Sequence, residues 1–292
     1  MGAYRECILN AKRKGVAVGH FNFANIEMFW GVVNAAKKLN VPVVLGLSES
    51  ERDWVGLKQA VVLIKSLRED GYEIFLNADH TYSFERVKEA IDIGFDSVIF
   101  DGAKLSIGEN IEITKKCVEY ANKINKERGS DILLEGELGY IGEGSMVRDV
   151  LPEGIQMTGV KDARRFVDET GVDLFAPAVG NVHGMLHPPK GEMSGNFDPP
   201  LDISRIHAIA NAVSAPLILH GGSGTPNLAE SIKAGINEVH ISTELRKAWH
   251  DALALHFKEF PDDIAPYKVG ALARVAIERV ATERLRLFSV SN

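Results

Sequence analysis

Cysteine is scarce in this sequence: only Cys7 and Cys117 occur among its 292 residues. They form neither a CxxC pair nor a zinc-finger spacing, which excludes a disulfide scaffold and a cysteine-bound structural zinc site. Isolated cysteines are typical of the reducing cytosol, where each serves as a small apolar side chain. The first residues also lack an apolar signal core. We therefore expect a cytoplasmic protein.

Excess positive charge and long apolar runs are missing as well. The formal net charge is −7 at pH 7 and the sequence pI is near 5.8, so no basic field is present to hold nucleic acid or an anionic membrane. No apolar run approaches the roughly 18 residues that a membrane-spanning helix requires. We expect neither nucleic acid nor a membrane as partner. A small anionic substrate stays compatible, because backbone amides bind phosphate without net positive charge.

Short apolar segments alternate with segments of helical periodicity along the whole chain. A helix is predicted after each apolar segment, for example at residues 52–68, and a further helix is predicted at residues 269–287. This eightfold alternation is typical of an α/β protein with a (β/α)8 TIM barrel, here as a single domain over residues 1–292 with an extra C-terminal helix. The predicted strands are residues 15–21, 41–47, 74–78, 97–100, 131–138, 172–179, 216–220 and 238–242.

A doubly wound open sheet is the alternative interpretation of the same alternation. The sequence has no G-x-G-x-x-G motif after the first predicted strand and no G-x-x-x-x-G-K-[ST] motif anywhere, so the nucleotide-binding forms of that fold are disfavoured. A barrel also makes a specific prediction. The carboxyl ends of its strands meet at one mouth, and the side chains that follow the strands meet there too.

Three histidines occupy positions at or after strand ends. His80 follows the third predicted strand, His183 follows the sixth, and His220 ends the seventh. Three imidazoles that meet at one mouth suit a divalent transition metal, most simply one catalytic Zn2+ ion, although Co2+, Fe2+ and Mn2+ accept the same ligands. A catalytic site with an open position is favoured over a structural one, because structural zinc sites are usually closed by cysteines.

Carboxylates accompany these histidines. Asp79 directly precedes His80 and is placed to move protons beside a metal ligand. Asp101 ends the fourth predicted strand, and Glu137 lies with Glu135 on one face of the fifth. Asp101 and Glu137 are candidates for an alternative metal position or for hydrogen bonds that orient the metal ligands. An ordinary structural role is the alternative for each.

The turn after the seventh predicted strand is rich in glycine. Its sequence at residues 221–224 is Gly-Gly-Ser-Gly, which lets backbone N–H groups approach an oxyanion at a place where barrels often bind phosphate. Ser242 and Thr243, at the end of the eighth predicted strand, add hydroxyl donors beside it. A linker turn without a ligand is the alternative interpretation.

The predicted C-terminal helix carries more apolar residues than the outside of a barrel would cover. Leu272, Val275 and Val280 are among them. We therefore expect a homo-oligomer, either a dimer or a tetramer.

Taken in order, these motifs resemble the zinc-dependent class II ketose-bisphosphate aldolases, the fructose-1,6-bisphosphate and tagatose-1,6-bisphosphate enzymes. The resemblance covers nearly the whole chain. It is carried by His20-Phe21-Asn22-Phe23-Ala24-Asn25-Ile26-Glu27, Ala78-Asp79-His80, Phe100-Asp101-Gly102, Glu135-Gly136-Glu137-Leu138-Gly139, Gly180-Asn181-Val182-His183-Gly184 and Leu219-His220-Gly221-Gly222-Ser223-Gly224.

The resemblance implies cleavage of a phosphorylated ketose between C3 and C4 to dihydroxyacetone phosphate and an aldehyde, through a metal-stabilised enediolate. It implies that His80, His183 and His220 bind zinc, that Glu137 offers an alternative metal position, and that Asp79 is the acid/base at the C4 hydroxyl. A monovalent cation, Na+ or K+, is expected near the backbone carbonyls of Val182, Gly184 and Gly221. The residues expected to bind the substrate or its phosphate are Asn25, Ser48, Gly184, Gly221, Gly222, Ser223, His240, Ser242 and Thr243.

Three positions depart from the pattern of that family. Its last strand usually carries an asparagine that meets the enediolate, where this chain has His240. Its mobile loop usually reads Gly-Gly-Glu, with the glutamate as a proton carrier; here, in the irregular segment 140–159, only Glu143 is available, shifted by one position. Its phosphate-binding lysine after the His-Gly pair is replaced by the Met185-Leu186-His187 segment. The changes cluster around the substrate, so the reaction class is retained while the ketose is left open.

Two other functions fit the same residues. One is a metal-dependent sugar-phosphate epimerase or isomerase that uses the same enediolate chemistry. The other is a non-catalytic sugar-phosphate binding protein, suggested by the loss of the usual asparagine and lysine. A Schiff-base aldolase is disfavoured, because no lysine ends a predicted strand.

Overall fold

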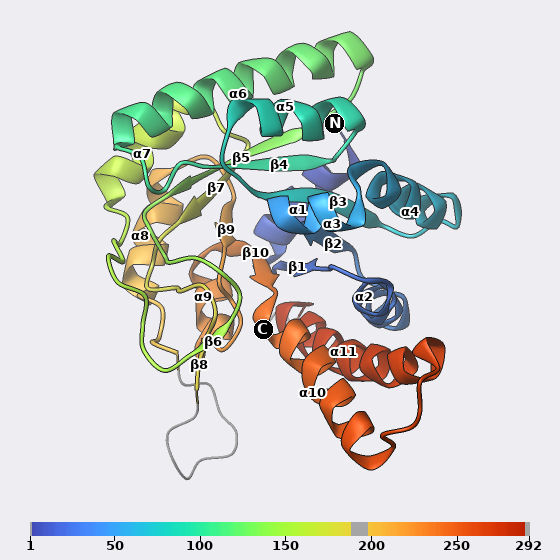
Figure 1. Cartoon of the computed structure of the whole chain (residues 1–292). Helices are drawn as coiled ribbons and strands as arrows, with labels where there is room; N and C mark the ends of the chain where they lie inside the picture. Colours follow the sequence, from blue (N-terminus) through green and yellow to red (C-terminus); the bar gives the residue numbers. More distant parts are fainter. Residues whose placement is uncertain (1, 188–197, 290–292) are drawn as a thin grey trace.

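The computed structural model describes residues 2–187 and 198–289. Within them, eight parallel strands close into a barrel in the order β1-β10-β9-β7-β5-β4-β3-β2, which confirms the predicted TIM barrel (Figure 1). The barrel strands are β1 (Val18–Asn22), β2 (Val43–Leu47), β3 (Ile74–Thr81), β4 (Ser97–Asp101), β5 (Leu133–Leu138), β7 (Leu174–Pro177), β9 (Leu217–Leu219) and β10 (Ile236–Ile241).

Helices surround the barrel, because each strand must be covered on the face that the barrel interior does not bury. β1 and β2 illustrate this arrangement, since all their residues are buried. The helices are α1 (Ala3–Lys14), α2 (Ile26–Leu39), α3 (Glu49–Val55), α4 (Leu57–Glu69), α5 (Phe84–Ile93), α6 (Ile107–Arg128), α7 (Val160–Thr170), α8 (Ile203–Ala212), α9 (Leu228–Ala234), α10 (Thr243–Glu259) and α11 (Pro266–Ser289).

The helix predicted at residues 52–68 is two helices. α3 ends and α4 begins at Gly56, whose φ of 91° is a conformation that glycine adopts without strain. Ser48 and Glu51 form a capping box at the start of α3, directly after β2. α3 is therefore a short helix that begins at the carboxyl end of β2.

Helix α1 was not expected from the sequence, and it closes the amino-terminal end of the barrel. Tyr4, Ile8 and Ala11 form its buried stripe, at the spacing of one helix face. They pack against the inward-facing residues at the beginning of the strands, in a second apolar core separate from the one beneath the outer helices. Those residues are Val18, Val44, Phe75, Leu133, Leu174, Ala176 and Ile218.

The irregular segment predicted at residues 140–159 includes strand β6 (Val147–Arg148). It pairs in parallel with β8 (Met185–Leu186) in a small sheet outside the barrel (Figure 1). At the C-terminal end of the chain, α10 and α11 lie side by side, and α11 also packs against α2 (Figure 1). No helix in residues 2–187 and 198–289 has the length and apolarity that a membrane crossing demands. The assignment of the chain to a single domain stays a prediction.

Candidate metal and substrate site

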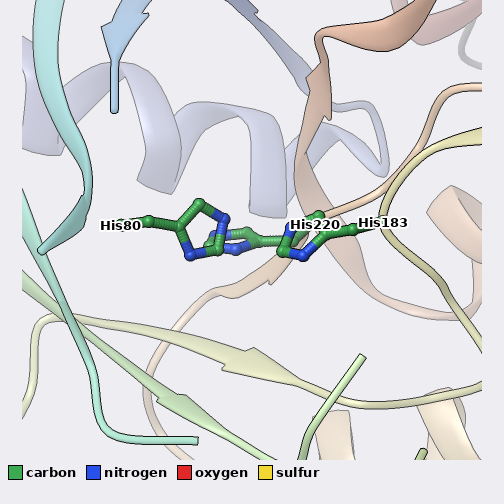
Figure 2. A group of neighbouring side chains, drawn as sticks. All are labelled: His80, His183 and His220. Carbon is green, nitrogen blue, oxygen red and sulfur yellow. The ribbon is translucent and has the colours of Figure 1, made fainter. Parts of the chain in front are cut away.

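Three histidines from distant parts of the chain meet at the carboxyl ends of the barrel strands (Figure 2). His80 lies near the end of β3, His183 lies in the loop after β7, and His220 directly follows β9. Each offers one ring nitrogen, and these nitrogens lie within 4.8 Å of one another. All three side chains line one cavity, as the barrel prediction required.

The other ring nitrogens of His80 and His183 are already occupied. His80 Nδ1 lies 2.9 Å from Asp101 Oδ2, and His183 Nδ1 donates to the backbone carbonyl of Gly142 at 2.7 Å. Such bonds fix the orientation of each ring and, in its neutral form, leave Nε2 with a free lone pair. One nitrogen of each ring is held by an oxygen atom and the other is left for an ion, which is the usual arrangement of metal-binding histidines.

His220 has the opposite arrangement. Its Nε2 lies 2.9 Å from Glu135 Oε1, so Nδ1 is the free nitrogen, and it is buried without a hydrogen-bond partner. Glu137 Oε2 is 3.2 Å from this Nδ1 and 3.4 Å from His80 Nδ1, on the strand face predicted for the two glutamates. Buried polar atoms rarely stay unpaired, so an orphaned imidazole nitrogen beside two others fits a divalent cation.

Asp79 and His80 both turn toward the cavity although they are neighbours in a strand, where successive side chains normally point to opposite faces. The pairing of β3 with β4 shifts register between Ala78 and Thr81, and His80 has a φ of 39°, which is rare for a residue other than glycine. The buried guanidinium of Arg52 secures this bend by donating to the Asp79 carbonyl and to Thr81 Oγ1. Local strain of this kind is typical of functional sites.

The Asp79 carboxylate is buried but well placed to act as a base. Its Oδ2 accepts a hydrogen bond from Asn22 Nδ2 at 2.9 Å, and its Oδ1 faces His80 Nε2 at 3.8 Å and His240 Nδ1 at 3.5 Å. Burial alone would raise the pKa of Asp79, but the charge of His80 is the largest opposing cause, and the pKa lies well below its usual range. The group is therefore ionised at neutral pH.

Most residues predicted to bind substrate line the same cavity, but two do not. Asn25 caps α2 instead, where its side chain accepts a hydrogen bond from Met28 N. Gly222 lies beneath the turn, with no room for a side chain against Val239 and the carbonyl of His240. Substrate binding by these two residues stays a prediction. The predicted residues that line the cavity are Ser48, Asp79, His80, Glu143, His183, Gly184, His220, Gly221, Ser223, His240, Ser242 and Thr243.

The glycine-rich turn and the start of α10 form one wall of the cavity. Ser223 Oγ accepts hydrogen bonds from the backbone N–H groups of Ser242 and Glu244, both at 3.3 Å. Ser242 Oγ is buried without a partner. Gly221 has a φ of 62°, and a side chain there would meet the carbonyl of Val182. A helix start, a positive-φ glycine and an unpaired hydroxyl make this wall suitable for an oxyanion.

Six cavity residues were missed by sequence reasoning: Asn22, Ser50, Tyr82, Gly144, Ser145 and Arg246. Arg246 lies in the first turn of α10 and pairs with Glu51 at 2.6 Å, which places a cation at the cavity. Its position three residues after Thr243 is the signal that would have found it. Glu143 is half exposed and pairs with Lys104 at the rim.

Comparison with known proteins agrees with this architecture. Residues 3–292 match the family model described as fructose-bisphosphate aldolase class-II. A fructose-bisphosphate aldolase of Staphylococcus epidermidis is 34% identical over 294 aligned positions, covering 99% of this chain and 97% of that protein. A probable fructose-bisphosphate aldolase of Bacillus subtilis is also 34% identical, covering 98% and 97%.

The fold comparison gives the same result. The crystal structure of the YdjI aldolase from Escherichia coli K12 superposes with a TM-score of 0.78 at 26% identity, covering 100% of this chain and 98% of that one. Family model, relatives and fold all extend over the whole barrel. The chain therefore belongs to the class II fructose-bisphosphate aldolase family, whose members are lyases.

Proposed function

We propose that the protein is a metal-dependent aldolase that cleaves a phosphorylated ketose between C3 and C4, giving dihydroxyacetone phosphate and an aldehyde. The observation that carries this proposal is the ionised carboxylate of Asp79 beside three imidazole nitrogens in one cavity. A carbon–carbon cleavage of this type needs a base for the C4 hydroxyl and an electrophile for the ketone oxygen, and Asp79 lies beside the histidines that would hold a metal ion as the electrophile.

His80, His183 and His220 would hold the metal ion, through Nε2, Nε2 and Nδ1 respectively. Three neutral nitrogen ligands and an open cavity suit Zn2+, with Co2+, Fe2+ or Mn2+ as alternatives. When bound, such an ion acts as a Lewis acid for the ketone oxygen and stabilises its negative charge by several kcal/mol. Asp101 contacts Nδ1 of His80, the ring nitrogen that would not bind the ion, so we propose that it orients this ligand. Glu137 lies 3.2 Å from His220 Nδ1, the nitrogen that would bind the ion, so we propose that it offers the alternative metal position. The proposed monovalent cation stays a prediction.

Glu135 offers a test of that orientation. Because its carboxylate fixes His220 with Nδ1 free, Glu135→Gln should leave the fold intact and lower zinc affinity by roughly 10- to 100-fold. Competition with a fluorescent chelator measures the change. Glu112→Gln, on the exposed face of α6, is the control and should bind zinc as the wild type does. Equal affinities in both variants would show that Glu135 does not orient the ligand.

Metal binding should also displace protons. Burial disfavours a charged His80, yet the carboxylates of Asp79 and Glu137 raise the pKa of His80 to about 9 in the ion-free protein. The same balance applies to His220. Burial lowers its pKa, but the charge of Glu137 and the hydrogen bond to Glu135 raise it well above the usual range. Both pKa values lie above 7. At pH 7 each ring therefore carries a second proton, which the ion must displace.

We therefore expect zinc binding at pH 7 to release about two protons, and the apparent affinity to rise as the pH increases from 7 toward 9. Calorimetry in buffers with different ionisation enthalpies gives the number of protons. Binding with no proton release at pH 7 would contradict this assignment.

The phosphate of the dihydroxyacetone phosphate half fits the wall formed by Gly221, Ser223, Ser242 and Thr243. Ser223 already organises the backbone amides at the start of α10, and Ser242 Oγ has no other partner. With the phosphate on this wall, we propose that the reacting carbons lie next to the histidines and Asp79, which line the same cavity. Asp79 then removes the C4 hydroxyl proton, while Asn22 holds the carboxylate in place.

Glu143 and three further cavity residues complete the proposed roles. Glu143 lies at the rim of the cavity on the irregular segment, where we propose that it exchanges the proton on the three-carbon fragment. The aldehyde half extends toward Ser48, Ser50 and Arg246. A guanidinium with two hydroxyl groups favours an aldehyde that carries an anionic group, a phosphate or a carboxylate.

A substrate panel tests the reaction class. The zinc-loaded protein is incubated with fructose-1,6-bisphosphate, tagatose-1,6-bisphosphate and ketose 1-phosphates with a terminal carboxylate, and products are followed by 31P NMR. We expect dihydroxyacetone phosphate from at least one of them. A rearranged sugar phosphate without a three-carbon product would instead indicate the epimerase or isomerase, and bound ligand without any turnover would indicate the binding protein.

Assembly and location stay predictions. Leu272 and Val275, on α11, are 47% and 63% exposed, and this apolar surface is the reason to propose a homo-oligomer. Sedimentation of the purified protein gives the number of subunits.

A further inference from the structure

A buried chain of hydrogen-bonding groups leads from helix α1 to the base of the cavity. Tyr4 donates its hydroxyl hydrogen to Glu238 Oε2 at 2.7 Å, and Glu238 Oε1 lies 3.0 Å from His240 Nε2. The other nitrogen of the same ring, Nδ1, faces Asp79 Oδ1 at 3.5 Å. All four side chains are buried. The amino-terminal end of the barrel is thus connected to the residue proposed as the base.

A second metal site is the first alternative for this cluster, because His20, Glu238 and His240 also lie close enough to share an ion. The ring geometry argues against it. The rings of His20 and His240 are stacked with centroids 3.5 Å apart and planes inclined by only 4°. Imidazole lone pairs lie in the ring plane, so those of two stacked rings lie in two separate parallel planes and do not converge on one ion.

Stacking and hydrogen bonding together fix the His240 ring. It lies between His20 and His220, whose centroid is 4.3 Å away, and this sandwich sets its plane. Glu238 sets its rotation, because one carboxylate oxygen accepts from Tyr4 and the other lies 3.0 Å from His240 Nε2, where we assign the N–H group. A neutral imidazole has only one N–H group, so Nδ1 presents a lone pair to Asp79.

Two buried atoms are left facing each other without a hydrogen bond: His240 Nδ1 and Asp79 Oδ1. With the N–H group of His240 on Nε2, one atom carries a lone pair and the other is a carboxylate oxygen, so both are acceptors and neither satisfies the other. A proton bound to Asp79 would satisfy both at once. In the proposed reaction, the C4 hydroxyl of the substrate supplies that proton.

We propose that Tyr4, Glu238 and His240 form a positioning chain for Asp79, in which His240 Nδ1 accepts a hydrogen bond from the Asp79 carboxyl group after it has taken the substrate's proton. This inference rests on the proposed function. In the step concerned, the proton passes from the C4 hydroxyl to Asp79 Oδ1 and the O–H electron pair forms the aldehyde C=O bond. The C3–C4 bond breaks and its electron pair passes to the three-carbon half.

Two reactions of the zinc-loaded protein separate positioning from folding. Cleavage of fructose-1,6-bisphosphate requires the C4 hydroxyl and hence Asp79. Exchange of the carbon-bound protons of dihydroxyacetone phosphate with D2O does not, because that molecule has no C4. A variant that only misplaces Asp79 should impair the first reaction and spare the second.

Tyr4→Phe/Glu238→Met removes the chain without leaving a buried hydroxyl or carboxylate unpaired. We expect kcat for cleavage to fall about 10- to 100-fold, with KM, zinc content and proton exchange within about twofold of the wild type. Tyr4→Phe alone removes one hydroxyl at the far end of the barrel and should give a smaller loss of the same kind. Ile8→Val, on the buried stripe of the same helix, is the control and should change neither reaction. Parallel loss of both reactions, or no loss of cleavage, would overturn the proposal.

The tautomer of His240 is measured without any substrate. In protein labelled with 15N-histidine and loaded with zinc, long-range 1H–15N spectra report which nitrogen is protonated, and the His240 signals are assigned by their loss in His240→Asn. We expect the Nε2–H form in the wild type. The Nδ1–H form would overturn the positioning chain even in an active aldolase. The Nε2–H form in a protein that cleaves no ketose phosphate would support the chain and instead contradict the proposed function.

Discussion

Replacing Asp79 by alanine is expected to lower kcat for ketose phosphate cleavage by about 10²- to 10⁴-fold, the usual contribution of a positioned general base. The zinc content should stay at the wild-type value, because the three histidine nitrogens that would hold the ion remain in place. The physical reason is local. Asp79 is the buried, ionised carboxylate beside His80, and no other carboxylate among the described residues lining the cavity is held as close to the histidines.

The measurement pairs steady-state kinetics with metal analysis of the same preparation. Glu112→Ala changes a carboxylate on the exposed face of α6 and controls for preparation effects. Exchange of the carbon-bound protons of dihydroxyacetone phosphate should survive in Asp79→Ala. Turnover close to that of the wild type would remove Asp79 from the mechanism, and loss of zinc would make it a metal-site residue instead.

Replacing His183 by alanine should abolish both metal retention and cleavage. The ring contributes one of three nitrogens within 4.8 Å of one another, and its Nδ1 bond to the Gly142 carbonyl shows that Nε2 is the nitrogen left for the ion. A Lewis acid worth several kcal/mol of barrier corresponds to a rate loss of about 10³-fold or more. Zinc per chain is measured by mass spectrometry after dialysis, with activity assayed in parallel.

His187 provides the matched control, because it is an exposed histidine four residues further along the same segment. His187→Ala should keep the ion and most of the activity. The pair of variants would contradict the metal assignment if both retained zinc equally, or if His183→Ala lost zinc without losing activity.

The fold was predictable because its signal repeats. Most barrel strands are short and largely apolar, and each predicted strand is followed by a helical period, so the alternation predicted the closed sheet. Helix α1 was missed for a physical reason: only Tyr4, Ile8 and Ala11 are buried in it, and a stripe of three residues among charged neighbours is a weak signal. The break at Gly56 was missed because an isolated glycine is tolerated within a helical pattern.

The candidate site was predictable where a side chain stands at a strand end. His80, His183 and His220 are brought together by the barrel mouth alone. Asn25 shows the limit of that reasoning, because a polar residue between a strand and a helix serves equally well as a helix cap. The hydrogen-bond partners of the site histidines inside the barrel, such as Glu135 and Glu238, could not be predicted in this way. They depend on which residues of neighbouring strands point inward at the same level of the barrel. That register is set by the closed sheet and not by local sequence.

X-ray diffraction from crystals of the zinc-loaded protein, recorded on both sides of the zinc absorption edge, tests the central claim most directly. We predict one strong anomalous peak per chain at the barrel mouth, within bonding distance of His80 Nε2, His183 Nε2 and His220 Nδ1. A peak bound elsewhere, or no peak at these three nitrogens in a protein that cleaves ketose phosphates, would contradict it.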